Sequence, residues 1–499
     1  MKRNSVANVR DLNSVFRLIA ALTLVVGFAA SAQKVDSAPD YDGSWQHFAQ
    51  PGVGEGKSSP VSGPQTDNTV SRFAAAEKVN FRKAVPYLTS GYSPYSVAVA
   101  DANGDGTLDL IIANQEQTKS NPEGSISVML GKGNGTFHKA VNYDSGGQSA
   151  FSIVVADVNG DGRLDLVVAN GCLGSNCATG SVGVLLGKGD GTFEKVVTYS
   201  SGAASVFGSH VAVGDLNGDG KLDLAVATTG AGCGNGCPQG FVAVLLGKGD
   251  GTFNKAKNYS TGGFDAIGWV AIADVNGDKK PDLLVANYCA TECSFPPAEG
   301  SVGVLLGKGD GTFRAAKTYP SGGDGAVSVA VADLNKDGKP DLLVANCGPL
   351  ACGPGSPGGN VAVLIGNGNG TFKPAVRYLA ANSPFNVVAA DVNGDGNFDI
   401  VVSNWGTSNG GTNDGSVTVL LGKGNGAFLP AQVFPSGGAE APSVAVADVN
   451  KDGRPDIVLA CVADTLNQNS TGVVTVLINA TKSASRSAES RAVALKTPQ

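Results

Sequence analysis

One nine-residue pattern, Asp-x-Asn-x-Asp-x-x-x-Asp, occurs seven times in this chain and constrains its fold more than any other feature. Successive copies lie 56 to 59 residues apart and begin at Asp101, Asp157, Asp215, Asp274, Asp333, Asp391 and Asp448. A sequence that repeats itself at a fixed period forms an array of similar units, each of which is completed by its neighbours. We therefore expect seven copies of one supersecondary unit.

Each repeat is typical of four short strands. Small and apolar residues alternate before each acidic loop, as in 96–100, and a run rich in Leu and Val follows it, as in 166–169. A variable loop leads to a third strand, as in 181–186, then to a Gly-Lys-Gly-Asp-Gly-Thr turn and a fourth strand, as in 193–199. Alternation indicates strands, and Asp-Gly or Asn-Gly between apolar runs indicates tight hairpins. The 71 glycines, about twice the usual share, fit so many turns.

The two ends of the repeat region indicate how the array closes. The seventh copy stops after its third strand, 473–478, whereas an unpaired fourth strand, 81–87, precedes the first copy and matches 137–143 in sequence. Pairing these ends removes the open sheet edge that a linear array would leave. We predict an all-β fold: a seven-bladed β-propeller of four-stranded antiparallel blades, its ring closed by an N-terminal strand pairing with the last blade. An open β-solenoid is the alternative, but it gives the displaced strand no role.

The segments outside the repeats are typical of targeting and linker sequence. Residues 1–32 carry Lys and Arg, then an apolar run, then Ala-Ser-Ala, which predicts a signal peptide. Residues 33–79 predict a flexible leader and 480–499 a disordered tail, which leaves 80–479 for the propeller. We expect a secreted protein, periplasmic or extracellular, without a membrane span. The formal charge of −7 and the lack of a basic domain argue against a nucleic-acid partner.

The acidic loops are candidate calcium sites. Counted from the first Asp, positions 1, 3 and 5 can turn three side chains inward, and the position 7 carbonyl and position 9 carboxylate can complete a shell of hard oxygens. Zinc would call for His or Cys. Asp, Asn and Gly alone could simply make turns, but three carboxylates in each of seven loops repel one another unless a cation is bound. We predict up to seven Ca²⁺, and Lys279, Lys336 and Lys451 indicate three weaker loops. The candidate ligands are, loop by loop, Asp101, Asn103, Asp105, Thr107 and Asp109; Asp157, Asn159, Asp161, Arg163 and Asp165; Asp215, Asn217, Asp219, Lys221 and Asp223; Asp274, Asn276, Asp278, Lys280 and Asp282; Asp333, Asn335, Asp337, Lys339 and Asp341; Asp391, Asn393, Asp395, Asn397 and Asp399; Asp448, Asn450, Asp452, Arg454 and Asp456.

These loops, followed by Gly-Lys-Gly-Asn-Gly-Thr-Phe, resemble the FG-GAP or VCBS repeats of bacterial secreted proteins and of the integrin α-subunit head. The resemblance covers residues 80–479. It implies a seven-bladed propeller, calcium between the first two strands of a blade, and a role in adhesion or ligand binding. Integrin heads hold metal in only some blades, and this chain lacks the integrin leg domains.

The variable loops are expected on the face opposite the acidic loops, and binding surfaces are often built on such loops. Tyr288 and Trp405 are the candidate ligand-binding residues there, although Trp405 could instead only pack over its own loop. Eight cysteines fall in these loops as close pairs, which in an exported protein predicts local disulfides, with shared zinc as the alternative. Cys461 is left over. The predicted pairs are Cys172 with Cys177, Cys233 with Cys237, Cys289 with Cys293, and Cys347 with Cys352.

The favoured function is a secreted calcium-binding module for adhesion or ligand binding, which recognises carbohydrate or extracellular matrix through the variable-loop face. The carboxylates are committed to the loops, and the G-x-S-x-G match at 406–410 lies in a loop rather than on a strand-to-helix elbow. We therefore expect no catalytic residues. The alternative is a calcium-dependent polysaccharide hydrolase or lyase with its active site at the axial mouth.

Overall fold

A computed structural model describes the repeat region with several gaps in its loops. The strands belong to a unit that includes 79–499, while 34–78 form a second unit of which only Lys78 is described. The predicted signal peptide and almost all of the predicted leader and tail lie outside the described residues. Those residues are 78–118, 121–173, 179–202, 210–229, 239–265, 268–291, 299–348, 359–407, 414–462 and 472–481.

The described residues form 27 β-strands and no helix, as the all-β prediction requires. Four sheets consist of four consecutive antiparallel strands. Their strands are β9 (His210–Gly214), β10 (Asp223–Thr229), β11 (Gln239–Leu245) and β12 (Lys257–Phe264); β13 (Val270–Ala273), β14 (Asp282–Asn287), β15 (Glu299–Leu305) and β16 (Lys317–Asp324); β17 (Ala326–Ala332), β18 (Asp341–Asn346), β19 (Asn360–Leu364) and β20 (Val376–Leu379); β21 (Pro384–Ala390), β22 (Asp399–Thr407), β23 (Asp414–Leu420) and β24 (Gln432–Ala439).

The fifth four-stranded sheet joins the two ends of the repeat region. It consists of β25 (Ser443–Ala447), β26 (Asp456–Cys461) and β27 (Val473–Leu477), and β1 (Val85–Leu88) pairs antiparallel with β27. The predicted pairing of the N-terminal strand with the last repeat is therefore present. Strand β1 is shorter than the predicted 81–87, because Phe81 makes only an isolated bridge to Asn479 before the ladder begins.

The remaining sheet has seven strands because two repeats share one long strand. Strand β5 pairs through its first half with β4 and through its second half with β6, so it is the outer strand of one four-stranded set and the inner strand of the next. The strands of this sheet are β2 (Tyr92–Ala100), β3 (Asp109–Glu116), β4 (Glu123–Met129), β5 (Val141–Ala156), β6 (Asp165–Cys172), β7 (Ser181–Leu185) and β8 (Val197–Ser200).

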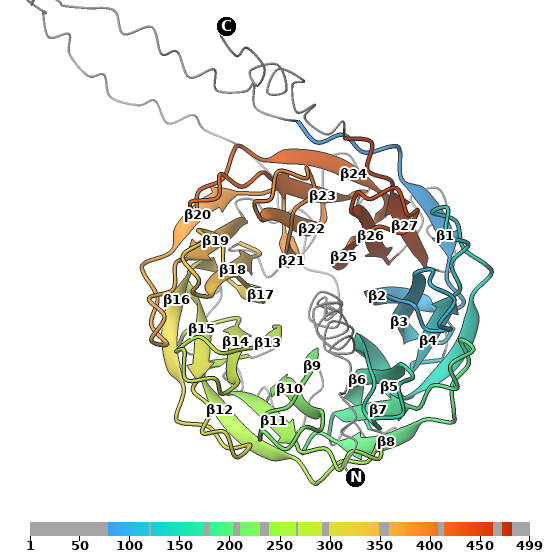
Figure 1. The fold of residues 1–499 in the computed structure, drawn as a ribbon, viewed down its shortest axis with the longest axis horizontal. Helices are drawn as coiled ribbons and strands as arrows, with labels where there is room; N and C mark the ends of the chain where they lie inside the picture. Colours follow the sequence, from blue (N-terminus) through green and yellow to red (C-terminus); the bar gives the residue numbers. More distant parts are fainter. Residues whose placement is uncertain are drawn as a thin grey trace, which may run out of the picture. The chain divides into compact units, whose positions relative to one another are not determined.

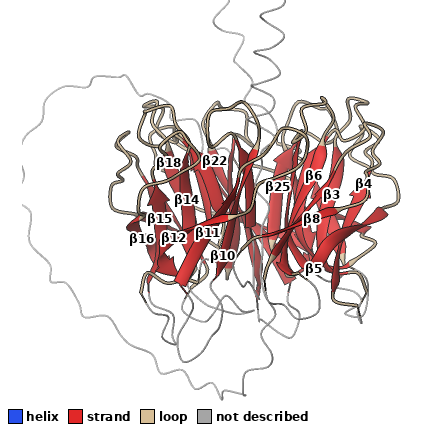
Figure 2. Ribbon diagram, turned by 90° about the horizontal axis from the view of Figure 1, so that it is seen from below, coloured by secondary structure: helices blue, strands red, loops and turns tan. Residues whose placement is uncertain are grey.

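The sheets of the described unit are arranged around a central axis (Figure 1). The innermost strands contact one another in cyclic order, from β2 to the second half of β5, then β9, β13, β17, β21 and β25, and back to β2. Seen from the side, the strands stand next to one another with loops at both ends (Figure 2). The acidic loops therefore all lie at one end of the sheets.

The innermost strands are slim on one face, as their small residues predict. Ala98 and Ala100 pack with Ile111 and Ile153 toward the next repeat. Val97 on the opposite face packs against the last sheet. A bulkier side chain at Ala98 would therefore overpack the core between two repeats.

Aromatic pairs join each outer strand to the following repeat. In each pair the ring of a Tyr or Phe on an outer strand meets, edge to face, the ring of the Phe that follows a glycine-rich turn or its equivalent, with centroids 5.2 to 5.5 Å apart. Such contacts stabilise beyond the area that they bury. The pairs are Tyr87–Phe137, Tyr143–Phe193, Tyr199–Phe253, Tyr259–Phe313, Tyr319–Phe372, Tyr378–Phe428 and Phe434–Phe81.

A belt of hydrogen bonds links the innermost strands near the axis. Five positions before each acidic loop, a polar side chain usually accepts a hydrogen bond from a backbone N–H of the next repeat. Ser96 Oγ accepts from Ile153 at 3.2 Å, and Ser443 Oγ accepts from Val97 at 3.2 Å, which links the last repeat to the first. Trp269 stands at this position in the fourth repeat, and there its backbone N–H donates to the Val327 carbonyl instead. The other acceptors of the belt are Ser152, His210, Ser328 and Asn386.

Candidate functional site

Each acidic loop joins the first and second strands of a repeat and is fixed by its last aspartate. In the second loop, Asp165 Oδ1 accepts a hydrogen bond from the Gly187 N–H at 2.7 Å, and Oδ2 accepts one from Val158 at 2.9 Å. The Asp165 carboxylate is buried and ties the loop to the turn between the third and fourth strands. The same pair of bonds is made by Asp109, Asp223, Asp282, Asp341, Asp399 and Asp456.

The other acidic side chains of a loop turn toward its own backbone. Asp157 Oδ2 accepts from the Gly162 N–H at 2.8 Å, and Asn159 Oδ1 accepts from the Asp161 N–H at 2.9 Å. Asp161 Oδ1 in turn accepts from Arg163 at 2.8 Å. Asp and Asn side chains favour such turns because their oxygens reach backbone N–H groups two residues onward. Side-chain oxygens at positions 1, 3 and 5 thus all accept backbone hydrogen bonds within one short loop, and their role as cation ligands stays a prediction.

The carboxylates of one loop are close enough to affect one another. Burial raises the pKa of Asp165 to about 6, and the nearby charges of Asp157 and Asp161 also raise it, whereas its two backbone hydrogen bonds lower it. The pKa of Asp399 is raised in the same way to about 7. Both causes penalise the charged form, and both are relieved when a cation lies beside the carboxylates. The oxygen-only donor set therefore fits a hard divalent cation such as Ca²⁺.

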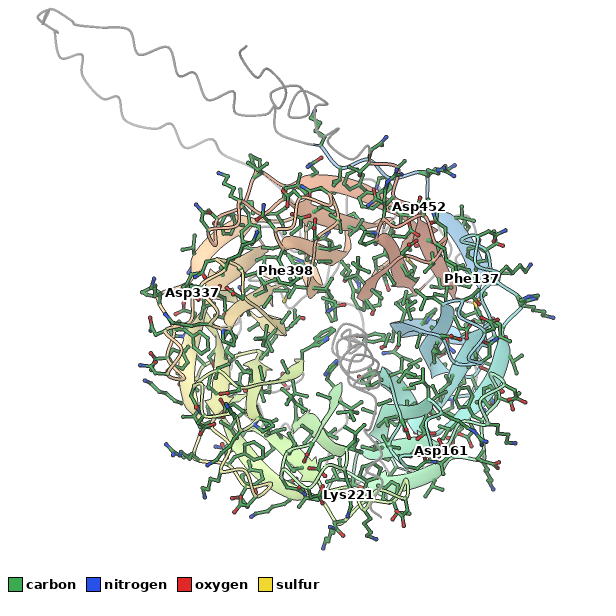
Figure 3. All side chains as sticks on the ribbon, viewed as in Figure 1. Phe137, Asp161, Lys221, Asp337, Phe398 and Asp452 are labelled. Carbon is green, nitrogen blue, oxygen red and sulfur yellow. The ribbon has the colours of Figure 1, made fainter. Side chains whose placement is uncertain are left out.

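The acidic side chains of the described loops are not arranged as a metal-coordination shell. Across the described ranges, no group of three or more His, Cys, Asp or Glu side chains is placed to hold a metal ion. In the second loop, the carboxylates of Asp157 and Asp161 accept backbone hydrogen bonds of their own loop. Residues labelled in Figure 3 from four of the loops, Asp161, Lys221, Asp337 and Asp452, lie around the ring of sheets.

Three loops carry lysine where the others have glycine. Lys279, Lys336 and Lys451 adopt φ values of 63°, 61° and 60°. This left-handed conformation is costly for residues with a Cβ, and the equivalent glycines Gly162 and Gly160 adopt it freely. The fourth, fifth and seventh loops thus each contain one strained residue, and their weaker cation binding stays a prediction.

In three loops the basic residue at position 7 pairs with the aspartate at position 5 of the same loop. Lys339 Nζ lies 3.5 Å from Asp337 Oδ2, and Lys221 Nζ lies 3.7 Å from Asp219 Oδ2. These pairs are exposed and contribute little to stability. A cation bound by the position 5 carboxylate would compete with them.

The structure separates the two candidate ligand-binding residues. Trp405 has only 7% of its surface exposed, and its ring contacts those of Tyr95 and Phe385 at centroid distances of 6.1 and 5.1 Å. Tyr288 is half-buried in a different core cluster, and its backbone N–H donates to the Asp265 carbonyl. Trp405 thus packs against other repeats rather than only over its own loop.

Trp405 belongs to a buried aromatic cluster that the sequence did not lead us to predict. Tyr95, Phe151, Trp269 and Phe385 lie near the start of the innermost strands and are buried together with Trp405 of β22. The His210 ring lies over Trp269 with a centroid distance of 5.0 Å. The available signal was an aromatic residue five or six positions before an acidic loop, in four of the seven repeats. The cluster brings residues of five repeats into one place.

The described cysteines leave the disulfide prediction open. Cys172, Cys289 and Cys347 are buried and none of them is free, but their predicted partners Cys177, Cys293 and Cys352 lie outside the described residues. The pair Cys233 and Cys237 also lies outside them. Cys461 is a buried free thiol, and burial raises its pKa to about 12.

Four-stranded antiparallel sheets around an axis, each with an acidic loop after its first strand, define a repeat protein of the β-propeller type. The FG-GAP-like repeat model matches 115–168, 231–285, 292–344, 350–402 and 409–459, which together make up more than half of the chain. The FG-GAP repeat model matches 93–129, 207–245 and 325–365. The chain belongs to the FG-GAP-like repeat family.

Similar curated proteins include two integrins and a phospholipase. Integrin alpha-IIb of Mus musculus is 28% identical over 242 residues, 45% of this chain and 23% of the integrin. Integrin alpha-V of Gallus gallus is 28% identical over 192 residues, 37% of this chain and 18% of the integrin. Phosphatidylinositol-glycan-specific phospholipase D of Bos taurus is 39% identical over 85 residues, 16% of this chain and 10% of the enzyme. The chain spans less than a quarter of the length of these integrins.

Similar solved structures have lower identity. BBS1N in complex with ARL6DN is 12% identical with a TM-score of 0.47, covering 80% of this chain and 96% of that one. The V. cholerae biofilm matrix protein Bap1 is 14% identical with a TM-score of 0.44, covering 81% of this chain and 91% of that one. Within the described residues, no helix is long and apolar enough to cross a membrane.

Proposed function

We propose that this protein is a secreted, calcium-binding seven-bladed β-propeller that acts as a ligand-binding or adhesion module. The observation that carries the proposal is the repetition of one acidic loop in seven equivalent places, in a chain of the same repeat family as the integrin α subunits. Repetition of this kind suits a rigid scaffold that presents loops to an extracellular ligand.

The seven-bladed closed ring is supported by contacts between the first and last repeats. The Gly135 N–H in the first repeat donates to the Val449 carbonyl in the seventh acidic loop, and Tyr87 on β1 packs against Phe137. Equivalent contacts occur between consecutive repeats elsewhere, as between Gly370 and Val275. The last and first repeats are thus joined like any other neighbouring pair, which is how a ring differs from an open array.

Calcium binding is supported by the donor chemistry and electrostatics of the loops. Asp157, Asn159, Asp161 and Asp165, with the position 7 carbonyl of Arg163, would hold the ion in the second loop, and the equivalent residues would do so in the others. Bound Ca²⁺ supplies positive charge that stabilises the ionised carboxylates. The side chains would have to give up some of their backbone hydrogen bonds when the ion binds. Glycine at positions 4 and 6 adopts the required positive φ without strain, so we expect the loops that have glycine at both positions to bind Ca²⁺ most tightly.

The ligand is proposed to bind on the variable-loop face, opposite the acidic loops. The candidate ligands are carbohydrate or an extracellular matrix protein, with Tyr288 and Trp405 as the residues singled out by sequence. Local disulfides would stiffen these loops, and secretion through the predicted signal peptide would provide the oxidising environment that they need.

The experiment measures calcium and ligand binding by the mature chain together. We expect calorimetric titration to show several bound Ca²⁺ per chain, and chelator to lower the melting temperature, because an ion that binds only the folded state stabilises it. We also expect binding to a glycan array or to laminin-coated and fibronectin-coated surfaces that chelator abolishes and calcium restores. An unchanged melting temperature in chelator would refute the role of calcium, and release of reducing ends from a bound polysaccharide would favour the hydrolase or lyase.

A further inference from the structure

Three buried hydrogen-bond donors without acceptors lie in the aromatic cluster at the start of the innermost strands. Among the residues that the structure describes, Tyr95 Oη, Trp269 Nε1 and His210 Nε2 have no hydrogen-bond partner. His210 Nδ1 accepts the Val270 N–H at 3.4 Å, so the neutral imidazole carries its proton on Nε2 and is a donor there. Folded proteins rarely bury donors without acceptors, so a group of three calls for a ligand or water that supplies oxygens.

The three donors belong to one continuous set of ring contacts. His210 lies over Trp269, whose ring centroid is 6.0 Å from that of Phe385, and Phe385 is in turn 6.4 Å from Tyr95. These residues come from four repeats, so the fold rather than any single loop brings them together. They form a patch of aromatic faces interrupted by polar N–H and O–H groups.

Strained backbone surrounds the same end of the innermost strands. Ser93, Ser149, Ser383 and Glu440 adopt φ values of 50°, 55°, 53° and 48°, each two residues before Tyr95 or its equivalent in another repeat. Non-glycine residues seldom adopt this conformation, and such strain tends to collect at binding sites. It is concentrated here at the end of the innermost strands opposite the acidic loops.

Two carboxylates add acceptors to this end of the strands. Asp265 is half-buried, and burial raises its pKa to about 6. Burial also raises the pKa of the Tyr95 phenol, and the nearby charge of Glu440 raises it further. Negative charge disfavours an anionic ligand. Aromatic faces, neutral donors and carboxylate acceptors together match a neutral sugar, whose C–H face packs on rings while its hydroxyls both accept and donate.

We propose that this axial cluster binds a neutral pyranose unit, with Tyr95, Trp269 and His210 donating to its oxygens. The inference rests on the proposed ligand-binding function and places its site. The rings of the cluster have at most 7% of their surface exposed, so a sugar must move them when it enters. Binding therefore changes the surroundings of Trp269 and Trp405.

Tryptophan fluorescence tests the proposal directly. The chain has three tryptophans, and the third, Trp45, lies in the predicted leader, so Trp45→Phe leaves an emission that comes from the cluster alone. The calcium-loaded W45F protein is titrated with cellohexaose, chitohexaose, maltohexaose and mannohexaose, and with an oligogalacturonate as the acidic comparison. We expect a saturable emission shift with at least one neutral hexasaccharide and none with the acidic one.

Tyr95→Phe separates binding from structure because it removes only the unpaired hydroxyl. We expect it to keep or raise the melting temperature and to weaken sugar binding by about tenfold, since the lost hydrogen bond is made only to the ligand. Tyr87→Phe is the control, because Tyr87 lies on the outer strand β1 and its hydroxyl already donates to the Gly135 carbonyl.

The outcomes distinguish the axial site from the general function. Binding to a glycan array or matrix surface without an emission change, or with full affinity in Tyr95→Phe, overturns the axial site and leaves the module function standing. A saturable shift with the acidic oligosaccharide alone also overturns the neutral-sugar proposal. If the unmodified protein binds no glycan and no matrix surface, both the axial site and the proposed module function are overturned.

Discussion

Tyr87 on β1 and Phe137 in the first repeat meet edge to face, with ring centroids 5.3 Å apart and planes at 86°. The Tyr87 hydroxyl also donates to the Gly135 carbonyl at 3.1 Å. Strand β1 belongs to the last sheet, so this contact joins the last repeat to the first. The pair Tyr199 and Phe253, at 5.5 Å and 82°, joins two repeats that are consecutive in the chain.

Replacement of Tyr87 by Ala should therefore destabilise the protein as much as replacement of Tyr199 by Ala. We expect each to lower the free energy of unfolding by roughly 2 kcal/mol, from the loss of a half-buried aromatic contact. Urea denaturation of both variants measures this. A silent Tyr87→Ala beside a destabilising Tyr199→Ala would show that the ring is open at this point.

Asp165 should stabilise the fold even without calcium, whereas Asp161 should not. Asp165→Asn leaves one backbone N–H facing an amide N–H₂, which should cost about 2 kcal/mol because a buried donor loses its acceptor. Asp161 is exposed, and Asn there can still accept from Arg163, so Asp161→Asn should change stability by less than about 0.5 kcal/mol. Urea denaturation in chelator compares the two.

Asp165→Asn and Asp161→Asn should have the same effect on the number of Ca²⁺ ions bound. Both remove a carboxylate from one loop, so each should reduce the number of bound Ca²⁺ in a calorimetric titration. If Asp165→Asn leaves chelated protein as stable as the unmodified chain, the two backbone bonds of Asp165 do not fix the loop.

His210 should make the protein sensitive to acid. Burial lowers its pKa from the usual 6.5 to about 3, so between these values the unfolded chain binds a proton that the folded protein does not. Stability is then fully present above pH 6.5 and falls by ~1.4 kcal/mol for each pH unit below it, down to about pH 3. Ser fills the equivalent position in four other repeats, so His210→Ser keeps an acceptor for the Val270 N–H and removes the titration.

The measurement compares the free energy of unfolding of both proteins at about pH 7 and pH 4.5. The unmodified chain should lose roughly 2 to 3 kcal/mol more than His210→Ser over this interval. Asp265, whose raised pKa acts in the opposite direction, is common to both and cancels. Equal losses would mean that His210 is not buried in its neutral form.

Lys279→Gly should stabilise the fourth loop. The lysine is held at a φ of 63°, and glycine relieves that strain, so the free energy of unfolding should rise by about 1 kcal/mol. Lys280→Gly is the matched control and should destabilise, because Lys280 does not have a positive φ and glycine there only adds freedom to the unfolded chain. Thermal unfolding of the two variants decides, and destabilisation by both would rule out strain at Lys279.

The repeat pattern was enough to predict the strands and the position of the acidic loops. Alternation in 96–100 and the Asp-Gly turns reflect local rules, and the sheets follow them closely. The predicted strand 193–199 is shorter in the structure, where β8 is Val197–Ser200, because Phe193 makes only an isolated bridge to Gly187 across the turn. The residues of the turn and those of the following strand have the same sequence pattern, so the sequence does not show where the strand begins.

Apart from the pairing of the N-terminal strand with the last repeat, the side-chain contacts between repeats could not be predicted from the sequence. Ser96 Oγ accepts a hydrogen bond from the Ile153 N–H, 57 positions away, and the sequence around either residue does not indicate that the two are partners. Tyr95, Trp269 and Phe385 likewise occur in separate repeats at similar positions, and only the packing of the sheets around a central axis brings their rings together. The sequence predicts Trp405 to lie in a variable loop, because it does not distinguish a loop from the end of a strand whose side chain is buried.

The two ends of the repeat region meet in one sheet, and this determines how the protein responds to mechanical force. Asn80 and Thr481 are joined by a hydrogen bond of 2.9 Å, and β1 runs antiparallel to β27. Tension applied between the two ends therefore pulls the strands apart from the same end and breaks their bonds one at a time. A load between one of these ends and a ligand on the opposite face would instead act along the strands and strain all the bonds of the pair together, so the way in which the protein is tethered would decide how much force the pair withstands.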